Sequence, residues 1–424
     1  MKVEQIYTGC LAQGAYYIES NGEVAIIDPL REVQPYIKKA TANKAKIKYI
    51  FETHFHADFV SGHVTLAKET GADIIYGPKA NPSFEAIIAK DNQEFKLGDV
   101  TIVALHTPGH TMESTTYLLK DEKGKDYAIF SGDTLFLGDV GRPDLAQKMG
   151  ELTERDLAGF LYDSLREKIM PLANDVIVYP AHGAGSACGK NMMKETVEGY
   201  EDIKLVLERG TRALSPKAFE AAANETGAIV LDVRNQDDFA AGHIPRSIFI
   251  GLDGSFAPWV GALIADVKQP ILLVTPVGME EEAVTRLSRV GFDGTLGYLE
   301  GGFDAWKKAA MEYDTVSQID ANKLKEVLKT EKAPVFDVRK ESEFLSEHIL
   351  DAKNTPLDFL NDHLAEFPEK KQFYVHCAGG YRSMIAASIL KSRGIHNLID
   401  VHGGFQAIQE AGIPVSEFVC PTTL

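Results

Sequence analysis

The chain has 424 residues, with 61 acidic and 44 basic side chains and a formal net charge of −17, which argues against a nucleic-acid-binding surface. Its 45% hydrophobic and 25% charged residues are ordinary for a soluble globular protein, and its length suffices for two to four domains. Four cysteines give no disulfide framework and suit a reducing compartment. Since the start has no signal-like apolar core and no apolar run reaches about 18 residues, we expect a cytoplasmic protein without a membrane span.

Residues 1–210 alternate short β-rich runs with helical patterns. We expect strands at residues 15–18, 24–27, 48–51, 73–75, 101–105, 115–119 and 127–130. We expect helices at residues 65–70, 154–170 and 190–208. Strands interleaved with helices, with polar residues at the strand ends, favour an α/β fold arranged as an α/β/β/α sandwich.

Residue types that ligate metals follow several of these strands. The stretch His54-Phe55-His56-Ala57-Asp58 leaves the apolar segment 47–51, and His110, Asp133 and His182 follow later runs. A lone His-x-His is weak evidence, because exposed surface histidines explain it as well. Four imidazoles and two carboxylates at strand ends predict a site for a borderline divalent cation.

The order of these residues resembles the metallo-β-lactamase superfamily. One position departs from it, since the two-metal hydrolases of that superfamily carry a histidine where this chain has Phe59. A phenyl ring ligates nothing, so a second metal would keep only Asp58, Asp133 and His182, beside an apolar wall.

The local text is similar to the persulfide dioxygenases of the superfamily. That resemblance implies one Fe(II) per chain, held by His54, His110 and Asp133 as a two-histidine, one-carboxylate triad with three open positions. It also implies that Arg142, in the loop after the aspartate, meets the thiol cofactor. The remaining residues of the set are predicted to orient the ligands or to bind a second metal: His56, Asp58 and His182.

The rest of the chain contains an internal repeat. Asp232-Val233-Arg234 recurs as Asp337-Val338-Arg339, and Gly301-Gly302-Phe303 recurs as Gly403-Gly404-Phe405. Offsets of about 100 residues are too long for a solenoid and suit duplicated domains. We therefore expect small α/β domains at 211–314 and 315–424.

Both copies resemble rhodanese, the sulfurtransferase domain. In the second copy an apolar strand leads into Cys377-Ala378-Gly379-Gly380-Tyr381-Arg382-Ser383, and a helix follows. Backbone N–H groups and the helix N-terminus should surround the sulfur with positive potential, which favours a thiolate or persulfide anion. The resemblance makes Cys377 and Arg382 catalytic. It makes the other loop residues part of the substrate-binding cradle: Gly379, Gly380 and Ser383.

The first copy lacks the reactive residues of this loop. The cysteine position falls on Thr275 or Pro276, and the first arginine after it is Arg286. Glu280 and Glu281 would repel the anions that a sulfurtransferase holds. We therefore predict that residues 211–314 are an inactive rhodanese.

Two other cysteines remain open. Cys188 lies in a glycine-rich turn before a predicted helix, with Lys190 nearby, and is either a redox thiol or a small packing residue. Cys10 is predicted to be structural.

Taken with its resemblances, the chain is predicted to be a persulfide dioxygenase fused to rhodanese domains, as in bacterial sulfide-detoxifying fusions. The implied reaction converts R–S–SH, O₂ and H₂O into R–SH and sulfite, and Cys377 then carries sulfane sulfur toward thiosulfate or in the reverse direction. We expect a homo-oligomer whose partners are a low-molecular-weight thiol persulfide, O₂ and sulfite or thiosulfate, without nucleic acid or membrane. The alternatives are a two-zinc thioester hydrolase of the glyoxalase II type and a non-enzymatic sulfur-carrier scaffold.

Overall fold

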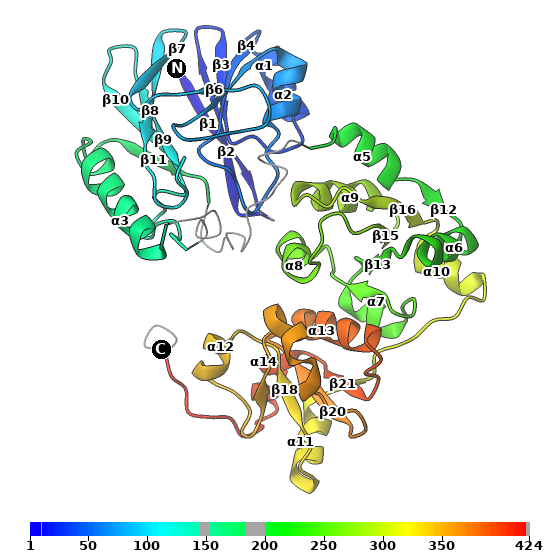
Figure 1. Cartoon of the computed structure of the whole chain (residues 1–424). Coiled ribbons are helices and arrows are strands. Elements are labelled where there is room, and N and C mark those ends of the chain that lie inside the picture. Colours follow the sequence, from blue (N-terminus) through cyan, green and yellow to red (C-terminus); the bar gives the residue numbers. More distant parts are fainter. Residues whose placement is uncertain (10, 145–151, 183–199, 421–424) are drawn as a thin grey trace. The chain divides into compact units, whose positions relative to one another are not determined.

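The structure is a computed structural model that describes residues 1–9, 11–144, 152–182 and 200–420. It divides into two compact units (Figure 1). The first comprises Met1–Val206 with Thr285–Asp293, and the second Leu207–Val284 with Gly294–Leu424.

Two β-sheets form the centre of the first unit. The six-stranded sheet has the order β1 (Lys2–Thr8), β2 (Gln13–Ser20), β3 (Glu23–Ile27), β4 (Lys46–Phe51), β5 (Asp73–Tyr76), β6 (Ile87–Ile88). The five-stranded sheet has the order β11 (Ile177–Pro180), β10 (Asp126–Gly132), β9 (Thr115–Lys120), β8 (Val100–His106), β7 (Gln93–Leu97). The parallel pairs are β3–β4, β4–β5, β5–β6 and β10–β11, and the remaining pairs are antiparallel.

The alternation of side chains along β2 shows how the layers are made. Tyr16 and Ile18 lie in a core shared with residues of β8, β9 and β10, so this face of the first sheet packs on the second sheet. Ala15 and Tyr17 lie in a different core with residues of α1 (Gln34–Ala42) and α2 (His63–Thr70). Successive strand residues point to opposite faces, so one strand supplies both cores.

The second sheet is covered on its outer face. Ile169 packs with Val103 and Leu105 of β8, and it belongs to the π-turn η2 (Leu165–Ile169) that continues α3 (Glu154–Ser164). The layer order is therefore helix, sheet, sheet, helix, which confirms the predicted α/β/β/α sandwich.

Most of the expected elements are present, with some differences in extent. The helix expected at 154–170 changes to a π-turn after Ser164. The helix expected at 190–208 is α5, Ile203–Gly210; residues 190–199 lie outside the described part. The elements α1, β1 and β7 were not anticipated, because their short, polar-rich patterns give a weak periodic signal.

The second unit contains two sheets of identical topology. The first has the order β12 (Ala213–Leu214), β16 (Thr295–Leu299), β15 (Ile271–Val274), β13 (Ile229–Asp232), β14 (Ile248–Phe249). The second has the order β17 (Gln318–Ile319), β21 (Leu398–Val401), β20 (Phe373–His376), β18 (Val335–Asp337), β19 (Lys353–Asn354). All pairs in both sheets are parallel.

Helices surround these sheets in the same chain order. The first copy contains α6 (Pro216–Thr226), α7 (Gln236–Ala241), α8 (Phe256–Leu263), α9 (Glu280–Arg289), whose residues from Thr285 on are grouped with the first unit, and α10 (Gly302–Lys308). The second contains α11 (Ala321–Thr330), α12 (Glu341–Ser346), the 3₁₀ segment η3 (Leu357–Glu366), α13 (Tyr381–Ser392) and α14 (Gly404–Glu410). The matching sheets and helices establish two copies of one fold.

The repeated sequence marks meet in space. The Arg339 guanidinium lies 3.8 Å from the centre of the Phe405 ring, so Asp-Val-Arg of the second copy touches its Gly-Gly-Phe. In the first copy Arg234 lies 4.4 Å from the centre of the Phe303 ring. The recurring motifs are therefore explained by packing that each copy needs, including the one predicted to be inactive.

Candidate metal centre and sulfur-transfer loop

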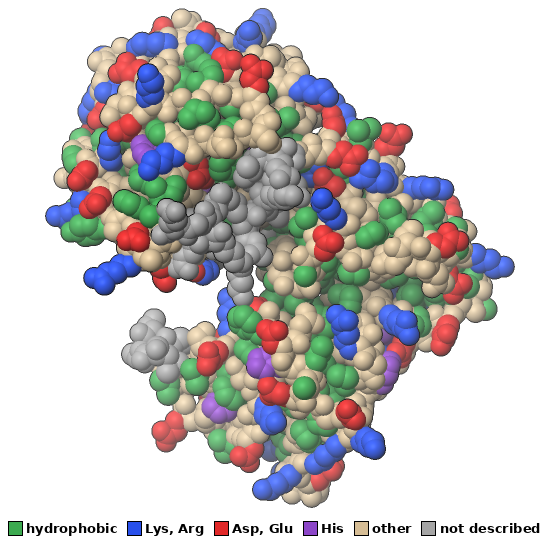
Figure 2. Space-filling view, viewed as in Figure 1, with side chains coloured by type: hydrophobic (Ala, Val, Ile, Leu, Met, Phe, Trp, Pro, Cys, Tyr) green, Lys and Arg blue, Asp and Glu red, His purple; other side chains and the backbone are tan. Residues whose placement is uncertain are grey.

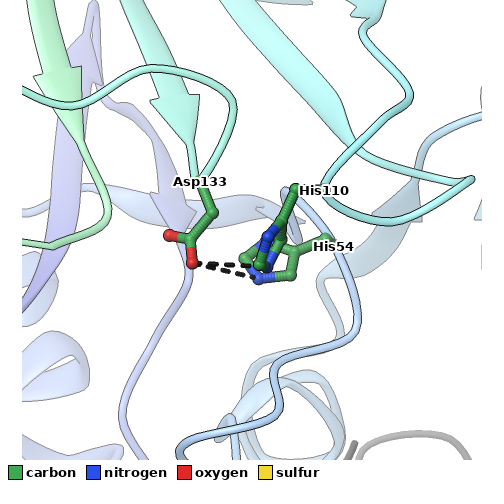
Figure 3. Close-up of side chains that lie close together, drawn as sticks. All are labelled: His54, His110 and Asp133. Carbon is green, nitrogen blue, oxygen red and sulfur yellow. Dashed lines mark ion pairs between the residues drawn. The ribbon is translucent and has the colours of Figure 1, made fainter. Parts of the chain in front are cut away.

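Two histidines and an aspartate converge at the ends of strands in the first unit. His54 follows β4, His110 follows β8, and Asp133 follows β10 directly; all three are buried (Figure 3). The Oδ2 atom of Asp133 lies 3.4 Å from His110 Nε2 and 3.9 Å from His54 Nε2. One donor atom of each residue lies within 4.8 Å of the others, so a single ion could join all three.

The second nitrogen of each imidazole is hydrogen-bonded, which directs Nε2 toward the centre. His54 Nδ1 lies 3.0 Å from the Thr53 hydroxyl, and His110 Nδ1 lies 3.0 Å from the carbonyl oxygen of Arg142. A carbonyl only accepts, so His110 Nδ1–H donates and Nε2 keeps its lone pair. Burial and the adjacent His56 ring lower the pKa of His54 well below its usual value, which favours the neutral, ligand-competent form.

His56 faces away from this centre. Its Nε2 lies 3.2 Å from Asp28 Oδ1 and 3.4 Å from Glu52 Oε2, and all three side chains are buried. Burial disfavours the charged ring, but the two carboxylates outweigh it and raise the pKa of His56 well above its usual value. His56, Asp28 and Glu52 thus form a second buried cluster, whose donor atoms also lie within 4.8 Å of one another, and His56 belongs to this cluster and not to the first triad.

Three residues could serve a second metal according to the sequence, and His182 lies near both of the others, Asp58 and Asp133. His182 Nε2 lies 3.1 Å from Asp58 Oδ2 and 3.5 Å from Asp133 Oδ1. Phe59 is fully buried, and its ring centre lies 4.3 Å from that of His56. His182 thus lies between the Oδ1 atom of Asp133 and Asp58, while Phe59 forms an apolar wall.

Arg142 contributes to the centre through its backbone. Its carbonyl orients His110, and its half-exposed side chain pairs with Asp144. The hydrogen bonds from Arg142 lower the pKa of Asp144. Contact between this guanidinium and a thiol cofactor remains a prediction.

The predicted sulfur loop joins β20 to α13 in the second unit. Cys377 is buried, and the backbone N–H of Gly380 donates to its Sγ at 3.1 Å. Gly380 is the N-cap of α13 with φ of 106°, a left-handed conformation that glycine adopts without strain. Ser383 Oγ donates to the Gly380 carbonyl at 3.1 Å. The sulfur therefore sits against a backbone donor at a helix N-terminus, while the exposed Gly379 borders the loop.

The Arg382 side chain is paired with a carboxylate of the protein. Its Nη1 and Nη2 donate to Glu343 Oε2 and Oε1 at 2.6 and 2.8 Å. These hydrogen bonds raise the pKa of Arg382. Sequence reasoning missed Glu343, because nothing in its local pattern links it to a residue 39 positions away.

The corresponding loop of the first copy places Thr275 where the second has Cys377. Val233 N bonds to Val274 O as Val338 N bonds to His376 O, and in each copy the next residue opens the loop. Gly278 N donates to Glu280 Oε1 at 3.0 Å. The Glu280 carboxylate thus accepts a hydrogen bond from the backbone N–H that corresponds to the one donating to sulfur in the second copy. Of the two candidates Thr275 and Pro276, Thr275 is therefore the residue at the cysteine position.

Cys10 and Cys188 lie outside the described residues, so the predictions for them stay open. Asp28 and Glu52 were also missed as partners of the metal centre. Asp28 follows β3 as the ligands follow their strands, and that position was the available signal.

Two protein-family models match this chain, one over the first unit and one over each of the two repeated copies. The metallo-beta-lactamase superfamily matches residues 8–182, and the rhodanese-like domain matches residues 215–309 and 320–411. A probable hydroxyacylglutathione hydrolase of Schizosaccharomyces pombe is 31% identical over 270 residues, covering 63% of this chain and 89% of that protein. The chain belongs to the metallo-β-lactamase superfamily. Two rhodanese-like domains follow its metallo-β-lactamase fold.

Three further comparisons differ in how much of each chain they cover. The cytoplasmic hydroxyacylglutathione hydrolase of Arabidopsis thaliana is 35% identical over 31% of this chain, which spans 53% of that protein. A metallo-beta-lactamase structure from Staphylococcus aureus has a TM-score of 0.60 and 26% identity, covering 70% of this chain and 98% of that one. The ETHE1 structure from Myxococcus xanthus has 25% identity and a TM-score of 0.39, covering 48% of this chain and 88% of that one.

The described residues include no helix long and apolar enough to cross a membrane. On the face drawn in Figure 2, acidic and basic side chains of the described residues are interspersed.

Proposed function

We propose that the chain oxidises the persulfide of a low-molecular-weight thiol with O₂ at a single Fe(II), and that its second rhodanese copy transfers sulfane sulfur. The first reaction converts R–S–SH, O₂ and H₂O into R–SH, sulfite and two protons. The second moves sulfur between Cys377 and sulfite or a thiol. Transfer from the Cys377 persulfide to sulfite leaves the thiolate and forms thiosulfate.

The donor set carries this proposal. His54, His110 and Asp133 offer two imidazoles and one carboxylate, the set of non-heme Fe(II) oxygenases. A third imidazole ligand, as in many zinc sites, would come from His56 or His182, but His56 Nε2 is paired with Asp28 and Glu52, and His182 Nε2 is paired with Asp58. Phe59 removes one donor from a second metal site. When bound, Fe(II) would supply O₂ activation and hold both reactants close.

The protein's own groups orient and enclose the reactants. The Thr53 hydroxyl and the Arg142 carbonyl fix the two imidazole rings. His182 holds the other oxygen of Asp133, which keeps Oδ2 turned toward the imidazoles. The half-exposed Arg142 guanidinium, which pairs with Asp144, would have to exchange this carboxylate for an acidic thiol carrier.

A two-zinc thioester hydrolase is the second candidate, and it is favoured by the names of the curated relatives, several of which are hydroxyacylglutathione hydrolases. Metal content and substrate separate the two. The dioxygenase predicts one iron per chain and O₂ uptake with a thiol persulfide. Two tightly bound metals per chain, with hydrolysis of a hydroxyacylglutathione and no O₂ uptake, would establish the hydrolase instead.

The decisive experiment is O₂ uptake by the iron-loaded full chain with glutathione persulfide. His54→Ala, His110→Ala and Asp133→Ala should each abolish it. Cys377→Ser should largely spare it, because Cys377 belongs to a different unit, but should shift the product from thiosulfate to sulfite. An unchanged product ratio would show that the two centres act independently.

A further inference from the structure

The arginine of the sulfur loop is occupied by a carboxylate of the protein. Arg382 is the second residue of α13, and its two terminal nitrogens donate to the two oxygens of Glu343. This parallel pairing is the geometry with which a guanidinium also binds sulfite, sulfate or phosphate oxygens. An oxyanion that reaches Arg382 must therefore displace Glu343.

Glu343 is itself held in place. It is the third residue of α12, and one of its oxygens accepts from the backbone N–H of Lys340 at 3.2 Å. Burial opposes ionisation of Glu343, but the hydrogen bonds and charge of Arg382 outweigh it and lower its pKa. The side chain is therefore ionised at neutral pH and oriented before any substrate arrives.

A second arginine of this copy, Arg339, is also paired with a carboxylate. Arg339 donates to both oxygens of Asp337 and to the Glu347 carbonyl, and it stacks on Phe405. Phe405 N in turn donates to the Cys377 carbonyl at 2.7 Å. Both arginines are thus paired with carboxylates, whereas the Gly380 N–H donates a hydrogen bond to the sulfur.

In the first copy, too, a glutamate carboxylate accepts hydrogen bonds within the corresponding loop. The position of Arg382 is occupied there by Glu280, whose carboxylate accepts from Gly278 N at 3.0 Å. Its Oε1 also lies 3.4 Å from the Thr275 hydroxyl. In both copies a glutamate carboxylate thus accepts hydrogen bonds from a group that could otherwise bind an oxyanion: the Arg382 guanidinium in the second copy and the Gly278 N–H in the first.

We propose that Glu343 is a specificity-determining residue of the Cys377 centre, which disfavours sulfur oxyanions such as thiosulfate and sulfite relative to thiols and thiol persulfides. This inference rests on the proposed role of Cys377 as a carrier of sulfane sulfur. A thiosulfate dianion needs a cation for its sulfonate end, and Glu343 competes for that cation. A thiol brings no sulfonate to the loop and meets no such competition.

The two half-reactions, with thiosulfate as donor and with a thiol as acceptor, differ in their leaving groups. With thiosulfate, the Cys377 thiolate attacks the outer sulfur, the S–S bond breaks, and sulfite leaves with the bonding pair. With a thiol acceptor, the Cys377 persulfide gives its outer sulfur to R–SH, forming R–S–SH and regenerating the thiolate. Since sulfur passes through a covalent intermediate, kcat/KM for donor and acceptor report separate half-reactions.

The test uses Glu343→Gln in the full chain, with Glu341→Gln as the matched control. Glu341 lies on the same helix and is exposed, whereas the hydrogen bonds of Arg382 go to Glu343. Glutamine keeps the shape of the side chain but removes the charge. We expect KM for thiosulfate and the inhibition constant for sulfite to fall about five- to tenfold, with less change at high ionic strength. kcat/KM for 2-mercaptoethanol as acceptor should change by less than about twofold, and the control should match wild type.

Other outcomes would overturn the inference. An unchanged thiosulfate KM would mean that Glu343 does not compete with oxyanions. A raised KM would mean that Glu343 orients Arg382 for substrate. Intact mass after incubation with thiosulfate separates this inference from the proposed function. If wild type gains no sulfur at Cys377, both fail. If it gains sulfur while the KM of the variant does not fall, the specificity role alone fails.

Discussion

Replacing His56 by asparagine should separate stability from metal binding in the first unit. His56 lies between Asp28 and Glu52, and all three side chains are buried. Removing the imidazolium leaves two adjacent buried carboxylates without their shared counter-charge. Breaking a buried pair in this way costs about 3–5 kcal/mol.

The lower end of that range applies here, because both carboxylates keep other donors. Thr53 donates to Asp28 through its N–H and its hydroxyl, each at 2.8 Å, and Ser61 donates to Glu52 at 2.6 Å. A loss of about 3 kcal/mol corresponds to a fall in Tm of about 6–12 °C for a unit of this size.

Calorimetry of the iron-free protein measures the loss, and the transition of the first unit is the one that saturating Fe(II) raises. His56→Asn should lower this transition yet still bind one iron. His54→Asn, by contrast, should abolish iron binding with a smaller loss of stability, because it removes a neutral ring. If His56→Asn instead loses iron and keeps its stability, His56 is a ligand and the two-histidine assignment is wrong.

Three further predictions concern other parts of the chain. Phe59→His should raise the zinc content of zinc-loaded protein from one toward two per chain, and an unchanged content would mean that the second site is absent for another reason. Thr275→Cys alone should acquire no persulfide from thiosulfate in a Cys377→Ser background, whereas adding Glu280→Ala should permit it; intact mass decides. Burial raises the pKa of Asp400 to about 6 despite a hydrogen bond from the Gln318 amide, so its folded pKa exceeds the unfolded one and stability falls as pH rises from about 4 to 6. Asp400→Asn should therefore stabilise the second unit by roughly 3 kcal/mol at pH 7.5 and by little at pH 4 in urea unfolding, and equal gains at both pH values would contradict this.

The sequence by itself predicted the fold of both units, and its resemblance to a known family named the three residues that the structure brings together as candidate metal ligands. Period-two alternation in strands such as β2 marks two buried faces, and residues at the ends of neighbouring strands meet at one edge of a sheet. The repeated Asp-Val-Arg and Gly-Gly-Phe revealed the duplication, because each copy needs the same arginine–phenylalanine contact to pack. Loss of the cysteine and arginine in the first copy was likewise visible without coordinates.

Only the tertiary structure decided how the charged groups are paired. His54 and His56 are two residues apart, yet one faces Asp133 and the other faces Asp28. Arg382 reads as a free cation in its loop, but Glu343, distant in sequence, neutralises it. Secondary structure follows from local patterns, whereas the partner of a buried charge depends on which distant segment packs beside it, and burial makes that partner decide the charge state.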